Sequence, residues 1–371
     1  MILQNIEMTN FRLHSKTSLN FSDKINYIIG GNGEGKTSIL EAIYYLCTTK
    51  NLNSSSDSDA VKFNEKFFDI KGNFRDLTEN KIRVLFDTEN NKKNCFIDEK
   101  SINRSASLIG KFPIVTLIQS DHSITSGSPA ERRRFVDSVI SQSSDTYLKI
   151  LIDFNKILKQ RAVILSELRE FRRTSLVNQL DAWSEALVKN GSEIIRHRIK
   201  FIEDFNEYVK NAYMHVMEER ETPQIILQSF QENLLLDDID RIYSELLKEA
   251  QNDEIRRASN LIGPHRDDFI FKINDRELKR FGSQGQHKTF QIALRFGQFF
   301  YMLDKMGRKP VFLMDDVFGE LDKGRAYKIS KYLSELGQTF ITMTDLTNID
   351  LFNKETDYKI ININSGAVVN A

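Results

Sequence analysis

The sequence has little cysteine, no long apolar run and no excess charge of either sign, and each shortage excludes a class of protein. Cys47 and Cys95 are too few for a disulfide scaffold or a zinc site built from thiolates. Lys and Arg number 52, as do Asp and Glu, so any nucleic-acid surface must be a local patch. No apolar stretch reaches the roughly 20 residues that cross a bilayer, and the first residues do not resemble a signal peptide. We therefore expect a cytoplasmic protein with no membrane partner.

Three stretches of different hydrophobic pattern follow one another along the chain. Residues 1–128 combine strand-like runs, at 2–8, 25–29, 67–74, 81–87 and 94–98, with one strong helix. Residues 129–255 are poor in glycine and proline and carry Leu and Ile at helical spacing, which predicts an antiparallel helical arm of about 40–50 Å. Residues 256–371 return to strands, at 268–273, 311–314, 339–343 and 357–363, and helices, at 285–303 and 323–336. The pattern predicts an α/β head in two halves with a short, coiled-coil-like helical arm inserted between them.

The strongest motif is a phosphate-binding loop in the segment INYIIGGNGEGKTSILEAIYYL. Its core matches G-x-x-x-x-G-K-[ST], and an apolar strand precedes it while an amphipathic helix follows. Glycines let successive backbone N–H groups point at phosphate oxygens, and the helix N-terminus adds positive charge. Lys36 is expected to reach the β- and γ-phosphates, and the Thr37 hydroxyl to bind Mg²⁺. The predicted ATP-binding residues are Gly30, Gly31, Asn32, Gly33, Glu34, Gly35, Lys36, Thr37 and Ser38.

A second motif, KPVFLMDDVFGELD, has the form of a Walker B strand. The apolar run at residues 311–314 suits the interior of a parallel sheet and ends in two aspartates. Asp315 is predicted to bind Mg²⁺ with Thr37, and Asp316 to act as the general base that activates water. Asp322, in Glu-Leu-Asp, is similar to the D-loop of ABC-type ATPases. Lys36, Asp315 and Asp316 are thus the predicted catalytic residues.

Asp315 comes 279 residues after Lys36 (315 − 36), a separation that most P-loop enzymes do not need. A helical insertion between two halves of one ATPase head, as in SMC-like and Rad50-like proteins, accounts for it. Ser283, Gly285 and Gln286 open a helix about 30 residues before Asp315 and resemble the ABC signature, which binds the γ-phosphate held by a partner's P-loop. An ordinary helix cap is the alternative for this segment alone.

Further segments narrow the resemblance to the RecF family. They are Asn-Phe-Arg at residues 10–12, GSPAERRRFVD at 127–137, Lys-Gln-Arg at 159–161, the lone Trp183, GPHRDD at 263–268 and Thr-Asp-Leu at 344–346. These segments span nearly the whole chain in family order. The chain departs from the family at Gln119-Ser120-Asp121, where F-x-P-E-D is more usual. Gln119 is nevertheless assigned as the metal-sensing glutamine of the nucleotide site.

The resemblance implies an ATP- and Mg²⁺-binding protein that forms a homodimer on ATP and binds single-stranded or gapped DNA. It implies a weak, DNA-stimulated ATPase that resets the dimer. It also implies action with RecO and RecR to load RecA, in DNA repair, recombination, replication restart and the SOS response.

Three other functions are weighed against this one. An ABC transporter ATPase does not account for the long spacing, a purely structural tether needs a longer arm with sustained heptads, and a metabolic kinase does not need the serine signature. Two basic segments stay ambiguous in sequence. Arg132, Arg133 and Arg134 either contact phosphates or form a solvated helix start or salt bridges to Glu131 and Asp137. His265 with Arg266 either belongs to a buried network or senses nucleotide.

Overall fold

Residues from both ends of the sequence fold together. The computed structural model describes the chain except for residues 55, 103, 172–173, 218–220, 232–233, 321–322, 334, 346–356 and 371. It divides into a first unit, Met1–Asp121, Met214–Glu219 and Gln291–Ala371, and a second unit, His122–Tyr213 and Arg220–Phe290. The second unit is therefore inserted, in sequence, between parts of the first.

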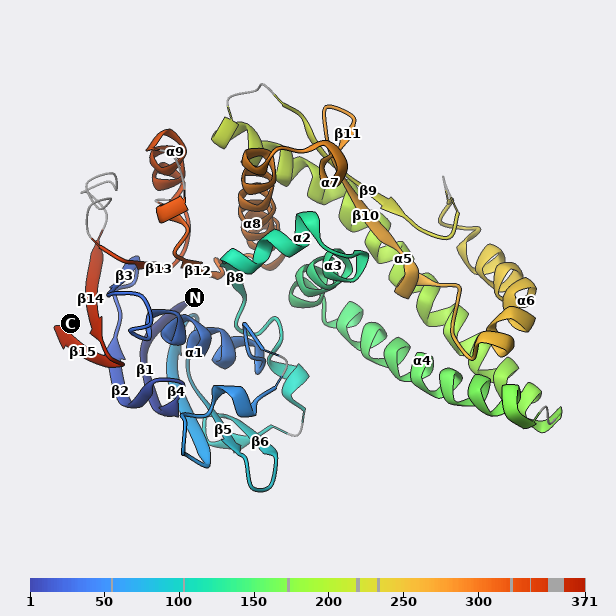
Figure 1. The fold of residues 1–371 in the computed structure, drawn as a ribbon, viewed down its shortest axis with the longest axis horizontal. Coiled ribbons are helices and arrows are strands. Elements are labelled where there is room, and N and C mark those ends of the chain that lie inside the picture. The colour runs from blue at the N-terminus through green and yellow to red at the C-terminus, as the bar shows by residue number, and fades with distance from the viewer. Residues whose placement is uncertain are drawn as a thin grey trace. The chain divides into compact units, whose positions relative to one another are not determined.

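One sheet of the first unit has six strands in the order β15-β14-β3-β13-β12-β8 (Figure 1). Five strands of this sheet run parallel to one another: β3 (Ile25–Ile29), β8 (Ile114–Leu117), β12 (Val311–Asp315), β13 (Thr339–Met343) and β14 (Tyr358–Asn364). β15 (Ala367–Asn370) returns antiparallel along β14. All residues of β3, β8 and β13 are buried, and such strands read as near-continuous apolar runs rather than alternating patterns.

The other sheet of the first unit is antiparallel, in the order β2-β1-β4-β5-β6-β7. Its strands are β1 (Ile2–Phe11), β2 (His14–Asn20), β4 (Phe67–Arg75), β5 (Glu79–Asp87), β6 (Lys92–Ile97) and β7 (Lys100–Ser101). Burial alternates along β4, as expected when one face of a sheet covers a core. Helix α1 (Lys36–Thr48) shares one core with both sheets, because Ile43 of α1, Ile70 of β4 and Leu313 of β12 belong to the same cluster.

Four helices form most of the second unit: α3 (Pro129–Ser143), α4 (Asp145–Phe171), α5 (Thr174–Met217) and α6 (Ile239–Arg257) (Figure 1). Ile164, Leu165 and Leu168 of α4 pack with Leu180 of α5 in a separate core cluster. α4 has 27 residues, so it is about 40 Å long, as predicted for the arm. α5 has 44 residues and is longer than predicted, and its last residues belong to the first unit.

A three-stranded antiparallel sheet, in the order β11-β10-β9, completes the second unit. It consists of β9 (Pro223–Gln228), β10 (Asp268–Ile273) and β11 (Arg276–Glu277). β10 was predicted from the sequence, whereas β9 lies in a stretch that was expected to be helical. The short helices α2 (His122–Ser126) and α7 (Leu278–Phe281) also belong to this unit.

Two further helices follow in sequence, α8 (Gln284–Met306) and α9 (Lys323–Leu333). The boundary between the units falls within α8, at Gln291. Both helices lie where the sequence predicted them. Among the residues that the structure describes, no helix combines the length and the apolar character that a membrane span requires.

Candidate nucleotide site

The predicted phosphate-binding loop connects β3 to α1, as its motif requires. Gly33 and Gly35 have φ angles of 78° and 101°, in the left-handed region that glycine adopts without strain. A Cβ atom on Gly30 would lie 2.4 Å from the Ile363 carbonyl oxygen, so only glycine fits there. The loop therefore has the backbone curvature that directs N–H groups towards an anion.

Lys36 is the first residue of α1, and its side chain contacts the start of this loop. Its Nζ atom donates hydrogen bonds to the carbonyl oxygens of Gly30, at 2.6 Å, and Gly31, at 2.8 Å. The side chain is mostly buried, so the ammonium group is held at the loop rather than extended into solvent. This arrangement keeps a positive charge where phosphate oxygens are expected.

Thr37 and Asp315 meet although they are far apart in sequence. The Thr37 hydroxyl donates to Asp315 Oδ1 at 2.9 Å and lies 3.1 Å from Oδ2. The hydroxyl of Thr342, on the neighbouring strand β13, donates to Asp315 Oδ1 at 2.7 Å and fixes the carboxylate. A hydroxyl and a carboxylate oxygen fit Mg²⁺, which takes one or two protein carboxylates and completes its shell with phosphate and water. Within the described part of the chain, no group of three or more His, Cys, Asp or Glu side chains is arranged to hold a metal ion.

Asp316 follows the end of β12 and has φ of 51°, an uncommon value for a residue other than glycine. Its backbone N–H donates to the Thr342 hydroxyl oxygen at 2.9 Å, which helps to hold this conformation. Left-handed residues of this kind gather at functional sites, where the surrounding structure maintains the strain. The position agrees with a group placed for chemistry beside the Asp315 carboxylate.

Gln119 begins a short turn, Gln119–Asp121, after strand β8. β8 and β12 are parallel neighbours, with Leu117 opposite Met314. Gln119, which follows β8, and Asp315, the last residue of β12, therefore lie at the same edge of the sheet. The turn is fixed by Asp121, which is buried and accepts hydrogen bonds from Arg295 Nε, at 2.9 Å, and Nη2, at 2.5 Å. Asp121 thus has a structural partner in α8 that no local pattern indicated.

The segment predicted as the signature lies in the second unit and forms a reciprocal helix cap. Ser283 Oγ accepts from the Gln286 N–H at 3.2 Å, and Gln286 Oε1 accepts from the Ser283 N–H at 2.8 Å. The cap uses a lone pair of Ser283 Oγ, so the hydroxyl proton remains able to bind an anion. The helix-cap and signature interpretations are therefore compatible.

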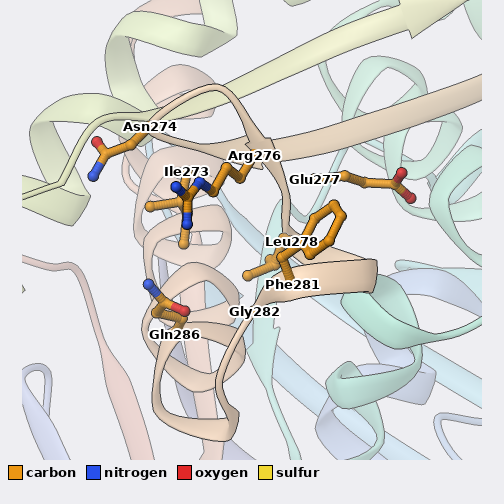
Figure 2. A pocket seen from close by; sticks show the side chains of 8 residues that line it. All are labelled: Ile273, Asn274, Arg276, Glu277, Leu278, Phe281, Gly282 and Gln286. Atoms are coloured by element: carbon orange, nitrogen blue, oxygen red, sulfur yellow. The ribbon is translucent and has the colours of Figure 1, made fainter.

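A cavity of about 320 Å³ lies beside this helix start. Figure 2 shows Gln286 and Gly282 on one side, with Arg276 and Phe281 from β11 and α7 nearby. Phe281 is 66% exposed, and the guanidinium carbon of Arg280 lies 5.4 Å from the centre of its ring. The sequence interpretation did not assign a role to this basic and aromatic pair, although it directly precedes the signature.

Asp322, the predicted D-loop residue, lies outside the described residues.

The structure shows the contacts of one of the ambiguous basic segments, residues 132–134. Arg132 is buried and forms two hydrogen bonds with the Asp268 carboxylate, at 2.7 and 2.9 Å. Arg133 donates to the carbonyl oxygen of Asp267. Arg134 is exposed and pairs with Glu131. Salt bridges and backbone contacts therefore occupy this segment.

His265 belongs to a hydrogen-bonded network within the second unit. Its Nε2 atom faces the Asn260 carbonyl oxygen at 3.1 Å, so Nε2 carries the proton of the neutral ring. Nδ1 is buried without a hydrogen-bond partner. Burial, followed by the positive charges of Arg266, Arg133 and Arg161, lowers the pKa of His265 to about 4.

This shift predicts a loss of stability in acid. Between pH 6.5 and about 4 the unfolded chain binds a proton at residue 265 that the folded chain does not, so stability falls as the pH decreases through this window. At about pH 5 the histidine is expected to cost about 2 kcal/mol relative to neutral pH. Urea unfolding at about pH 7.5 and pH 5 measures this, with His265→Gln as the variant that does not titrate. Equal losses in the wild type and in His265→Gln would show that His265 does not contribute.

The fold and the site together define an ABC-type P-loop ATPase head. The model of the family described as RecF/RecN/SMC N terminal domain matches residues 2–364. A protein called DNA replication and repair protein RecF, from Chloroherpeton thalassium, is 40% identical over 93% of this chain and 95% of its own length. A protein of the same name from Salinibacter ruber is 33% identical over 93% of this chain and 85% of its own length. The chain belongs to the RecF family.

Solved structures agree with this assignment. A structure of the recombination mediator protein RecF-ATP in the RecFOR pathway superposes with a TM-score of 0.90 at 29% identity, over 99% of this chain and 96% of that chain. An SMC head bound to the C-winged helix domain of ScpA superposes with a TM-score of 0.58 at 14% identity, over 99% of this chain and 96% of that chain. The second likeness concerns the fold alone, and it confirms the predicted head architecture.

Proposed function

We propose that the chain binds ATP with Mg²⁺ at residues 30–38 and hydrolyses it slowly. The observation that carries the proposal is the hydrogen bond between Thr37 and Asp315, which joins the phosphate-binding loop to the end of β12. Lys36 is held at the same loop by two carbonyl oxygens. The solved structure of RecF-ATP, which this chain resembles over nearly its whole length, supports ATP as the nucleotide.

Each residue of the site has a role in this proposal. The loop N–H groups and Lys36 bind and orient the phosphates. Thr37 and Asp315 hold Mg²⁺, which supplies charge neutralisation when it is bound. Asp316 accepts a proton from the attacking water. Gln119, which follows the strand next to β12, is the metal-sensing glutamine of this proposal.

ATP joins two copies of the chain in this proposal. Ser283, Gly285 and Gln286 form the start of α8 in the second unit, where backbone N–H groups and the Ser283 hydroxyl can bind a γ-phosphate presented by a second copy. The homodimer is therefore expected only when ATP is bound. Hydrolysis separates the two copies.

The DNA function is proposed from the relatives, whose names place them in DNA replication and repair and in the RecFOR pathway. We infer that the ATP-bound dimer binds single-stranded or gapped DNA in the cytoplasm. With RecO and RecR it supports RecA loading in recombinational repair, replication restart and the SOS response. RecF-family membership favours this function over a transporter ATPase, a structural tether or a metabolic kinase.

Light scattering tests the dimer. The wild type is expected to be a monomer without nucleotide and to increase in mass towards a dimer with ATP and Mg²⁺. Ser283→Arg is expected to bind ATP but stay monomeric, because a long cation replaces the hydroxyl at the helix start. Ser283→Thr, which keeps a hydroxyl and a helix cap, serves as the matched control and is expected to dimerise.

A Ser283→Arg variant that dimerises as the wild type does would show that the signature assignment is wrong.

The DNA function has its own measurement, the ATPase rate with gapped duplex and with fully paired duplex of the same sequence. Stimulation by the gapped substrate at least several-fold above the paired one is expected. If the ATPase rate per molecule of protein does not change with added DNA or with protein concentration, the result would instead support an enzyme of small-molecule metabolism.

A further inference from the structure

The phosphate-binding loop is held from outside by a ring of close polar contacts that involves no residue of the predicted site except the loop itself. His14 Nε2 lies 3.1 Å from the Gly35 carbonyl oxygen, and His14 Nδ1 lies 3.0 Å from Thr17 Oγ1. Thr17 Oγ1 lies 3.4 Å from the Gly366 carbonyl oxygen. The Gly366 N–H donates to the Glu34 carbonyl oxygen at 2.9 Å, which closes the ring at the loop.

The ring connects three parts of the chain that are distant in sequence. His14 and Thr17 lie on β2, Glu34 and Gly35 belong to the loop, and Gly366 lies in the turn between β14 and β15. The Ser365 N–H in the same turn also donates to the Glu34 carboxylate. The turn therefore binds both the side chain and the backbone of Glu34.

Side chains are disfavoured at both glycines, by the backbone conformation at each and by close contacts around them. Gly35 and Gly366 have φ angles of 101° and 75°. A Cβ atom on Gly35 would lie 3.2 Å from His14 Nε2, and one on Gly366 would lie 2.8 Å from the Leu13 carbonyl oxygen. A Cβ atom on Gly35 would also lie 3.6 Å from Gly366 Cα, so both β2 and the β14–β15 turn pack against the loop at Gly35.

The hydrogen-bond partners determine the protonation of His14. A carbonyl oxygen only accepts, so Nε2 must carry a proton to bind Gly35. His14 is completely buried, and burial lowers its pKa, with Lys62 acting in the same direction, so the ring is neutral near pH 7. Nδ1 is then an acceptor, and the Thr17 hydroxyl donates its one proton to it at 3.0 Å rather than to the Gly366 carbonyl oxygen, which is farther away at 3.4 Å. The Nε2–H tautomer is therefore the one that the surroundings select.

The contact with the Gly35 carbonyl oxygen fixes the orientation of the peptide between Gly35 and Lys36. In a trans peptide the C=O and the following N–H point in opposite directions. Fixing the Gly35 carbonyl on His14 therefore directs the Lys36 N–H away from His14. This N–H is one of the backbone donors that a phosphate-binding loop offers to its ligand.

We propose that His14 is a positioning residue for nucleotide binding, which holds the peptide between Gly35 and Lys36 in its phosphate-binding orientation while the β14–β15 turn holds Glu34. The inference rests on the proposed function, in which this loop binds ATP. His14 acts through the loop backbone and does not itself contact the nucleotide.

Two variants of His14 separate positioning from simple packing. The side-chain amide of glutamine can take the place of Nε2–H, whereas that of asparagine reaches only the position of Nδ1. ATP affinity, measured by calorimetry on the full chain with Mg²⁺, is expected to fall about 10-fold or more in His14→Asn and less than about 3-fold in His14→Gln. Thermal unfolding is expected to shift by similar amounts in both, because both replace the same buried ring.

Thr17→Val provides a second test that leaves the His14 side chain in place. It removes the hydroxyl that donates to Nδ1 while keeping the side-chain shape, and is expected to weaken ATP binding by about 3-fold. Thr9→Val, at a position of β1 opposite Lys16 of β2, is the matched control and is expected to bind as the wild type does. This pair decides the question if His14→Asn does not fold.

The outcomes distinguish this inference from the proposed function. Lys36→Ala is expected to abolish ATP binding, and a wild type that does not bind ATP would overturn both proposals. If the wild type binds ATP and Lys36→Ala does not, the proposed function stands. In that case, equal affinities of His14→Asn and His14→Gln, or a Thr17→Val affinity equal to that of Thr9→Val, would overturn the positioning role alone.

Discussion

Replacing Asp316 by asparagine is expected to slow ATP hydrolysis by ~10²–10⁴-fold, the usual contribution of a general base. ATP affinity is expected to change by less than about 3-fold, because Asp316 is not among the groups proposed to bind phosphate or Mg²⁺. Asparagine adopts φ near 51° as readily as aspartate, so the backbone after β12 is preserved. Single-turnover hydrolysis with protein in excess of ATP measures the chemical step, and calorimetry measures affinity separately.

Asp315→Asn is the matched control, since it makes the same chemical change one residue earlier. Asp315 accepts hydrogen bonds from Thr37 and Thr342, so this variant is expected to lose Mg²⁺-dependent affinity as well as rate. Asp316→Asn should also persist as a dimer in ATP and Mg²⁺, because the nucleotide between the copies is not hydrolysed. Hydrolysis by Asp316→Asn at the wild-type rate would show that another group activates the water.

The nucleotide loop and the two aspartates could be predicted because their chemistry is local in sequence. The glycines and Lys36 occur within one short segment, and their spacing reflects the backbone curvature that a phosphate requires. Asp315 ends a strand whose other residues are all buried, so the apolar run before it stands out. Both motifs therefore predict which elements hold these residues, and the structure confirms those elements.

The partners that hold these residues could not be predicted, because they come from distant strands and carry no pattern of their own. His14 is an isolated histidine at the start of β2, and Thr342 is one threonine in a buried strand. The Asp121–Arg295 pair joins a turn to a helix far along the chain. The strand β9 was missed for a similar reason, since its pairing with β10 is decided by tertiary contacts and not by local propensity.

Arg161 shows the same limit, and it carries the largest expected effect on stability. The Lys-Gln-Arg segment indicated family membership but not a role for the arginine. The structure buries Arg161 completely, with Nη2 2.6 Å from Glu254 Oε2 on α6 and Nη1 2.8 Å from Asn260 Oδ1. Its Nε donates to Ser184 Oγ on α5 at 3.0 Å. One side chain therefore connects α4, α5 and α6.

Arg161→Met is expected to destabilise the second unit by about 3–5 kcal/mol, because it leaves the Glu254 carboxylate buried without its positive partner. Trp183, the only tryptophan, packs on the core cluster formed by α4 and α5, so its fluorescence reports unfolding of this unit. Urea unfolding followed by this signal gives the change in free energy. Arg241→Met is the surface control, since Arg241 pairs with Asp238 and Glu245 in solvent and is expected to change stability by less than about 1 kcal/mol.

A double variant tests whether the unpaired charge is the cause. Glu254 Oε1 accepts from the Leu261 N–H at 2.7 Å, so Glu254→Gln removes the charge but keeps an acceptor for that N–H. Added to Arg161→Met, it is expected to recover about 1–3 kcal/mol, because a buried neutral amide costs less than a buried unpaired carboxylate. No recovery would mean that Arg161 stabilises the three helices through packing and its bonds to Ser184 and Asn260, and that its charge is not what α6 requires.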